Sequence, residues 1–156
     1  MVPSAPTTEV AVRSLEASDV AEIVRIDGLV TGKRKPAYWT RVFADVFAPR
    51  AAGTRIGIVA ASRSGLFGFL LGDVRAFEFG SEACGWVFAV GVDPAHGRRR
   101  VGSTLLAEAS RRFRAAGVDR VRTMVRRTDV PMLSFFRASG FEGGPFVQLE
   151  HGLVAE

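Results

Sequence analysis

The chain has 156 residues, of which 47% are hydrophobic and 24% charged, and 21 basic side chains against 16 acidic ones give a net charge of +5. This length is typical of one domain, and the apolar fraction excludes a mainly disordered chain. The single cysteine, Cys84, excludes an internal disulfide framework and a cysteine-only zinc site, and it favours a reducing compartment. We expect one domain over residues 1–156, with residues 1–7 flexible and no metal.

The apolar stretches are too short to cross a membrane. The longest are residues 65–72 and 85–92, whereas a spanning helix needs roughly 20 residues. The N-terminal sequence MVPSAPTTEV lacks the basic patch and apolar run of a signal peptide. These features predict a cytoplasmic protein with no membrane partner.

The positive charge is concentrated in one segment. Residues 96–127 contain ten arginines and two acidic residues, whereas the rest of the chain carries a net charge of −3. Arginine suits bidentate contact with phosphate, so the segment fits either a phosphate-bearing cofactor or a nucleic-acid backbone. Several of its arginines alternate along an expected strand without interleaved aromatic residues, which argues against a single-strand nucleic-acid binder.

Strand-like and helix-like patterns alternate along the first half of the chain. Residues 9–15 alternate apolar and polar side chains, as a half-buried strand does. Ser18 is a candidate N-cap for a first helix, and Pro36 opens a second helix with a clear amphipathic spacing. Three strands of an antiparallel meander are then expected, at residues 55–61, 66–79 and 85–92.

The second half continues the alternation. A helix is expected over residues 99–116, followed by a strand at 121–125 and by a helix that Asp129 caps and that ends near Ser139. A last strand is expected near Pro145 to Leu153. The predicted order is β-α-α-β-β-β-α-β-α-β, which indicates a mixed α and β domain.

The segment VGVDPAHGRRRVGSTLL, residues 90–106, carries the most information about function. A strand ends at Val92, an Asp-Pro turn follows, and a loop rich in glycine and arginine leads directly into a helix. The free N–H groups and positive dipole end of a helix's first turn form an anion site suited to a diphosphate. The alternative is an ordinary connection between strand and helix whose arginines are solvated.

Two motifs resemble those of the GCN5-related N-acetyltransferases. The family's acetyl-CoA loop, Q/R-x-x-G-x-G/A after a V-x-P turn, corresponds to residues 97–102 after Val92-Asp93-Pro94, with Gly97 in place of Gln or Arg and Arg100 in place of Gly. The family motif N-x-x-A-x-x-F-Y-x-x-x-G-F corresponds to residues 129–141, DVPMLSFFRASGF. The resemblance covers nearly the whole chain and implies a single-domain α/β fold with a central mixed, mostly antiparallel sheet flanked by helices.

The resemblance implies an acetyl-CoA-dependent N-acetyltransferase in which a primary amine attacks the thioester directly. The Val90 N–H would polarise the thioester carbonyl at a splay between the fourth and fifth strands. Arg100 suits the loop if its φ is negative. The implied cofactor-binding residues are Val90, Gly91, Val92, Gly97, Arg98, Arg99, Arg100, Val101, Gly102, Ser103, Asp129 and Phe136.

The acid–base residues are less clear, because Phe88 and Phe136 stand where the family commonly has a glutamate and a tyrosine. The candidates that remain are Glu78 and Glu82, the nearest carboxylates upstream, and Tyr38, the only tyrosine. Each also fits a structural role, in a solvated turn or on an amphipathic helix. A non-catalytic acyl-CoA-binding or regulatory module of the same fold is therefore the alternative function.

The acceptor is expected to be a small-molecule or peptide amine. Residues 31–39 occupy the connection that shapes the acceptor pocket in similar proteins, and Lys33, Arg34 and Lys35 favour an acceptor that bears a carboxylate or phosphate. A solvated basic loop explains the same residues. The sequence leaves the choice between a monomer and a homodimer open.

Overall fold

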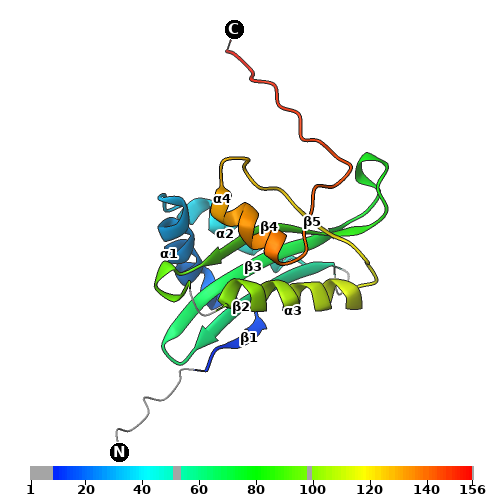
Figure 1. The fold of residues 1–156 in the computed structure, drawn as a ribbon. Coiled ribbons are helices and arrows are strands. Elements are labelled where there is room, and N and C mark those ends of the chain that lie inside the picture. The colour runs from blue at the N-terminus through cyan, green and yellow to red at the C-terminus, as the bar shows by residue number, and fades with distance from the viewer. Residues whose placement is uncertain (1–8, 51–53, 98–99, 156) are drawn as a thin grey trace, which may run out of the picture. The chain divides into compact units, whose positions relative to one another are not determined.

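The computed structural model describes residues 9–50, 54–97 and 100–155 (Figure 1). The segment expected to be flexible, residues 1–7, and the cofactor-loop candidates Arg98 and Arg99 lie outside the described residues. The chain divides into two compact units, Met1–Met124 and Val125–Glu156, each described below by itself. Over the described ranges, no helix combines the length and apolar character needed to cross a bilayer.

The first unit contains a five-stranded sheet in the order β1-β2-β3-β4-β5. The first four strands pair antiparallel and β5 pairs parallel with β4, which confirms the expected mixed, mostly antiparallel sheet. Its elements are β1 (Ala11–Ser14), α1 (Val20–Thr31), α2 (Pro36–Val46), β2 (Arg55–Ser62), β3 (Gly65–Arg75), β4 (Cys84–Val92), α3 (Val101–Ala115) and β5 (Val121–Thr123). The second unit contains α4 (Val130–Ala138), so the predicted order is confirmed up to this helix.

The last expected strand is not formed in the structure. Residues 141–155 contain no helix or strand, and Leu149 and Leu153 are 89% and 91% exposed. Gly143 and Gly144 lose more backbone entropy on ordering than other residues, and Pro145 has no N–H to donate to a ladder. The prediction of a strand near Pro145 to Leu153 is therefore wrong.

Two predicted boundaries are also wrong. Ser18 does not cap α1, because it lies inside a short 3-10 turn at Ala17–Asp19 in which Asp19 Oδ2 accepts the Glu16 N–H at 2.8 Å. Strand β3 ends at Arg75 rather than at Phe79. Phe77 and Phe79 have φ angles of 61° and 53°, which are left-handed and end the extended backbone.

Within the first unit, α1 and α2 lie on one face of the sheet and α3 lies on the other (Figure 1). On one face Ile26 of α1 and Trp39 of α2 pack with Phe69 in one buried cluster. On the other face α3 lies over glycines of β3 and β4, which leave room for its side chains. A Cβ on Gly85 would lie 2.6 Å from the Phe113 ring, and one on Gly68 would lie 2.9 Å from Val101 Cγ1. Glycine therefore sets how closely α3 approaches the sheet.

Gly85→Ala tests this packing. We expect it to lower the free energy of unfolding by about 1–3 kcal/mol, because the new methyl overlaps a fully buried ring. Urea unfolding gives the value. Gly143→Ala, where a Cβ would meet nothing within 4 Å, is the control and should change it by less than about 0.5 kcal/mol. If the cost of Gly85→Ala is unchanged in a Phe113→Leu background, the ring is not its cause.

Candidate functional site

Strand β4 is paired on both sides over only part of its length. It pairs with β3 from Cys84 to Val92, whereas its pairing with β5 covers Gly85 to Val87. The register to β3 shifts just beyond this point and leaves Phe88 as the extra residue of a β-bulge. Thr123 Oγ1 donates to the Val87 carbonyl at 2.9 Å where the ladder ends. Within the part of the chain that the structure describes, residues 89–92 thus have a strand partner on one side only.

The polar backbone groups of this open edge have a defined direction. The Asp93 N–H donates to the Phe67 carbonyl of β3 at 2.8 Å, so Asp93 faces β3. Successive residues of an antiparallel strand alternate in direction, which turns Gly91 toward β3 and turns Val90 and Val92 away from it. Their N–H and C=O groups therefore point to the side where β5 has ended.

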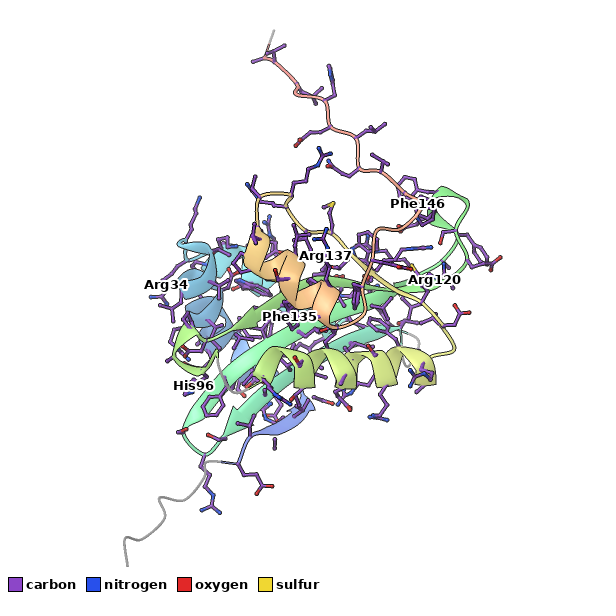
Figure 2. The ribbon with its side chains drawn as sticks, viewed as in Figure 1. Arg34, His96, Arg120, Phe135, Arg137 and Phe146 are labelled. Carbon is purple, nitrogen blue, oxygen red and sulfur yellow. The ribbon has the colours of Figure 1, made fainter. Side chains whose placement is uncertain are left out.

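The loop after β4 begins with an ordered turn. Asp93 is 7% exposed; its Oδ1 accepts the Ala95 N–H at 3.0 Å and its carbonyl accepts the His96 N–H at 2.8 Å. The His96 ring stacks on Phe67 with 3.9 Å between ring centroids. Figure 2 shows His96 at the end of the sheet where α3 begins. The connection is therefore tied to β3 at its start.

A side chain from α1 also holds this turn. Arg25 Nη1 donates to Asp93 Oδ2 at 2.9 Å, and its Nε and Nη2 donate to Glu22. The hydrogen bond from Arg25 lowers the pKa of Asp93. The hydrogen bonds to Glu22 and then to Asp93 raise the pKa of Arg25. A carboxylate whose folded pKa is lowered stabilises the fold above its unfolded pKa of about 3.9 and loses that contribution only as pH falls through the folded value. The ion pair is therefore complete at neutral pH.

The start of α3 presents backbone N–H groups without helical acceptors. The first turn contains the N–H groups of Val101, Gly102 and Ser103. The first helical hydrogen bond runs from the Thr104 N–H to the Arg100 carbonyl at 3.0 Å. The Val101 side chain is buried, so only its backbone faces the loop. No acidic residue stands in this turn. The positive end of the helix dipole is left available to an anion.

We expected Arg100 to suit the loop if its φ were negative, but the structure shows a positive φ. Its φ and ψ are 55° and 26°, in the left-handed region. A side chain there costs roughly 1–2 kcal/mol relative to the right-handed conformation, and glycine avoids most of this cost. The residue type that the family motif has at this position is thus the one that the backbone favours.

Two substitutions of Arg100 separate backbone strain from charge. Arg100→Gly should raise the free energy of unfolding by about 1 kcal/mol, because it removes the Cβ from a left-handed residue. Arg100→Ala removes the same charge but keeps the Cβ, so it should give no such gain. Chemical denaturation of both variants measures the difference. Equal free energies of unfolding for the two variants would show that the left-handed φ of residue 100 does not destabilise the fold.

The structure does not bring the expected carboxylates to the open edge of β4. Glu78 and Glu82 are exposed in the connection between β3 and β4. Cys84, which follows them, is six residues before Val90, or about 20 Å along an extended strand. They lie at the opposite end of β4 from the loop that leads to α3.

Tyr38 lies on α2, on the same side of the sheet as α1. Its ring and that of Trp39 form a T-shaped pair with 5.2 Å between centroids, and Trp39 and Phe69 form a second such pair at 5.4 Å. Phe69 is the β3 partner of Gly91. Tyr38 is therefore linked to the open edge through two ring contacts.

Asp129 and Phe136 belong to the second unit. Asp129 Oδ1 accepts the Met132 N–H at 3.2 Å, which confirms the predicted cap of α4. The Phe136 ring lies 5.0 Å from those of Phe135 and Phe141. Within this unit, Asp129 therefore caps a helix and Phe136 packs against neighbouring rings.

Sequence reasoning missed two features of the site. The bulge at Phe88 has no local signal, because it depends on the register of β3. The bond between Arg25 and Asp93 joins residues 68 positions apart, and neither residue type marks the pairing in the sequence.

Comparison with known proteins decides the family. Residues 26–141 match the model of the acetyltransferase (GNAT) family. The chain belongs to this family. It is accordingly an acyltransferase of the N-acetyltransferase type, as its motifs indicated.

Solved structures share the fold of this GNAT chain at low sequence identity. The aminoglycoside N-acetyltransferase AAC(6')-Iy in complex with CoA aligns with a TM-score of 0.81 and 14% identity, over 97% of this chain and 99% of that one. The aminoglycoside 6'-N-acetyltransferase AAC(6')-IG from Acinetobacter haemolyticus gives 0.76 and 15%, over 93% and 99%. A transcriptional regulator from Bacillus halodurans C-125 gives 0.77 and 16%, over 92% and 100%. Comparison with curated proteins finds no matching sequence.

Proposed function

We propose that this chain moves an acetyl group from acetyl-CoA to a primary amine by direct attack. In this proposal the diphosphate binds the N–H groups at the start of α3, with the loop from Gly97 to Arg100, and the pantetheine arm lies along Val90 to Val92. The open edge of β4 carries the proposal, because its backbone points away from β3 at residues that have lost β5 as a partner. The match to the family model across both compact units supports one acetyltransferase domain.

The Val90 N–H acts as the oxyanion donor. When the amine attacks, the thioester carbonyl becomes a tetrahedral oxyanion, which this N–H stabilises more strongly than the ground-state carbonyl. The C–S bond then breaks and CoA leaves as a thiolate, and the extra proton of the amine passes to solvent or to a base. Tyr38 remains the candidate side chain for proton transfer because of its ring contacts toward Phe69.

The acceptor proposed is a small amine that carries a carboxylate or phosphate. Lys33 and Arg34 are exposed beside α1, and Figure 2 shows Arg34 at this surface. The nearby buried carboxylate, Asp27, is already bonded to Lys35 Nζ at 3.0 Å and to Trp39 Nε1 at 2.9 Å. The accessible charge of this connection is therefore positive, which suits an anionic acceptor better than a polycation.

The second candidate is a module that binds acyl-CoA without turnover. Phe88 at the bulge favours it, because this position of β4 carries no ionisable group.

The structure weakens the case that the arginine-rich segment, residues 96–127, binds nucleic acid. Arg111 and Arg112 of α3 both bind Glu108, lowering the pKa of that carboxyl to about 2, so part of the segment's charge is neutralised within the chain.

Calorimetry with acetyl-CoA and with CoA tests the binding site. We expect Gly102→Glu to abolish binding, because its carboxylate would face the diphosphate at the start of α3. Arg114→Glu makes a larger charge change near the end of the helix, about 20 Å away and beyond the Debye length of about 8 Å, and should alter affinity less than twofold. Wild-type protein that binds neither ligand would refute both candidate functions. Unchanged affinity in Gly102→Glu would refute the loop assignment.

Val90→Pro tests the oxyanion donor. Proline removes an N–H that points away from β3, so the ladder to β3 should persist while kcat for thiol release falls about 10²- to 10³-fold. Val90→Ala keeps the N–H and should stay within about threefold of wild type. Thiol release is measured with a panel of amines. Calorimetry with CoA checks that the variants still bind the cofactor. Wild-type binding without turnover on the whole panel would favour the non-catalytic module.

A further inference from the structure

The turn that opens the cofactor loop is held by an ion pair with one partner on α1. Asp93 is 7% exposed and uses both carboxylate oxygens, one for the Ala95 N–H and the other for Arg25 Nη1. Because the side chain of Asp93 bonds the backbone of its own turn, any movement of the carboxylate moves that backbone. Arg25 therefore constrains residues 93–95 through Asp93.

Arg25 is itself constrained by a second carboxylate. Glu22, one turn earlier on α1, accepts from Arg25 Nε and Nη2 at 3.2 Å and 2.9 Å, which leaves Nη1 for Asp93. A guanidinium bonded on two sides has little rotamer freedom. The next residue of α1, Ile26, is fully buried in the same core cluster as Phe69, which is the β3 partner of Gly91. The residue next to Arg25 is thus anchored at the open edge of β4.

We propose that Arg25 is a positioning residue for acetyl-CoA, which holds the Asp93 turn so that the following N–H groups converge on the diphosphate. The inference rests on the proposed function of this loop. Arg25 touches no substrate in this role and acts only through Asp93. Diphosphate bonds persist from the bound substrate to the transition state, so the loss of Arg25 should raise KM for acetyl-CoA and leave kcat unchanged.

The chain contains a matched control for this ion pair. Arg13 bonds the buried Asp19 at 2.8 Å and 2.9 Å, and the exposures of the Arg13 and Arg25 side chains are 38% and 39%. Asp19 also bonds the backbone of its own turn, at the Glu16 N–H. Arg13 lies on β1, three strands from β4 in the sheet. Arg13→Ala should therefore cost similar stability without affecting the cofactor loop.

The experiment compares Arg25→Ala, Arg25→Lys and Arg13→Ala in steady-state kinetics and in calorimetry with acetyl-CoA. We expect Arg25→Ala to raise both KM and Kd about tenfold with kcat within twofold, Arg25→Lys to recover part of the loss, and Arg13→Ala to match wild type. Asp93→Asn, which keeps an oxygen for Ala95 but removes the charge, should follow Arg25→Ala. Hydrogen exchange at Ala95 and His96, whose N–H groups bond Asp93, should speed up in Arg25→Ala and stay unchanged in Arg13→Ala.

Each alternative outcome has its own meaning. Equal affinity of wild type and Arg25→Ala for acetyl-CoA, or an equal loss in Arg13→Ala, overturns the positioning role and leaves the proposed function standing. A fall in kcat without a rise in KM also overturns it. Wild-type protein that does not bind acetyl-CoA overturns the proposed function and this inference together.

Discussion

The β4–β5 ladder stops after Val87 and Thr123 while β4 itself continues for five residues against β3. Polar backbone at the edge of a sheet must find a partner, and a strand that has lost its neighbour offers that role to a ligand. The bulge at Phe88 falls at this point, so the strand changes direction where its second partner ends. In the proposed function, the binding of pantetheine and the polarisation of the thioester both depend on this interruption in the sheet.

The rest of the first unit keeps the interrupted edge rigid. The α1 and α2 cluster holds one face through Phe69 and Ile26, and α3 presses on the other face through glycines that admit the Phe113 ring. Because the helices are seated on both faces, the last residues of β4 keep their direction without a neighbour on the β5 side. The start of α3 is also brought to the end of β4, since Val101 packs against Gly68, the partner of Val92. The packing of the core therefore also sets the geometry of the proposed site.

The sequence predicted the elements well where periodicity is local. Helix α2 begins at Pro36, and the five strands of the sheet, the cap of α4 by Asp129 and the loop before α3 were found where expected. The features that the sequence did not predict share a cause, because each depends on residues far away in the chain. The strand near Pro145 needs a partner, and the bulge at Phe88 and the bond from Arg25 to Asp93 depend on tertiary register. The left-handed φ of Arg100 was missed because arginine rarely adopts it.

The contact proposed for the loop explains the weak match of its motif. Backbone N–H groups are the same for every residue except proline, so in a site made of them Gly97 would replace a glutamine or arginine at little cost to diphosphate binding. Such a site depends on φ, close approach and rigidity rather than on side-chain chemistry. Arg100 departs from the motif where φ is positive, and there the cost is strain rather than a lost contact. In our proposal this rigidity comes from the bond of Arg25 to Asp93, and Arg25 lies outside the motif, so a pattern centred on the loop does not reveal it.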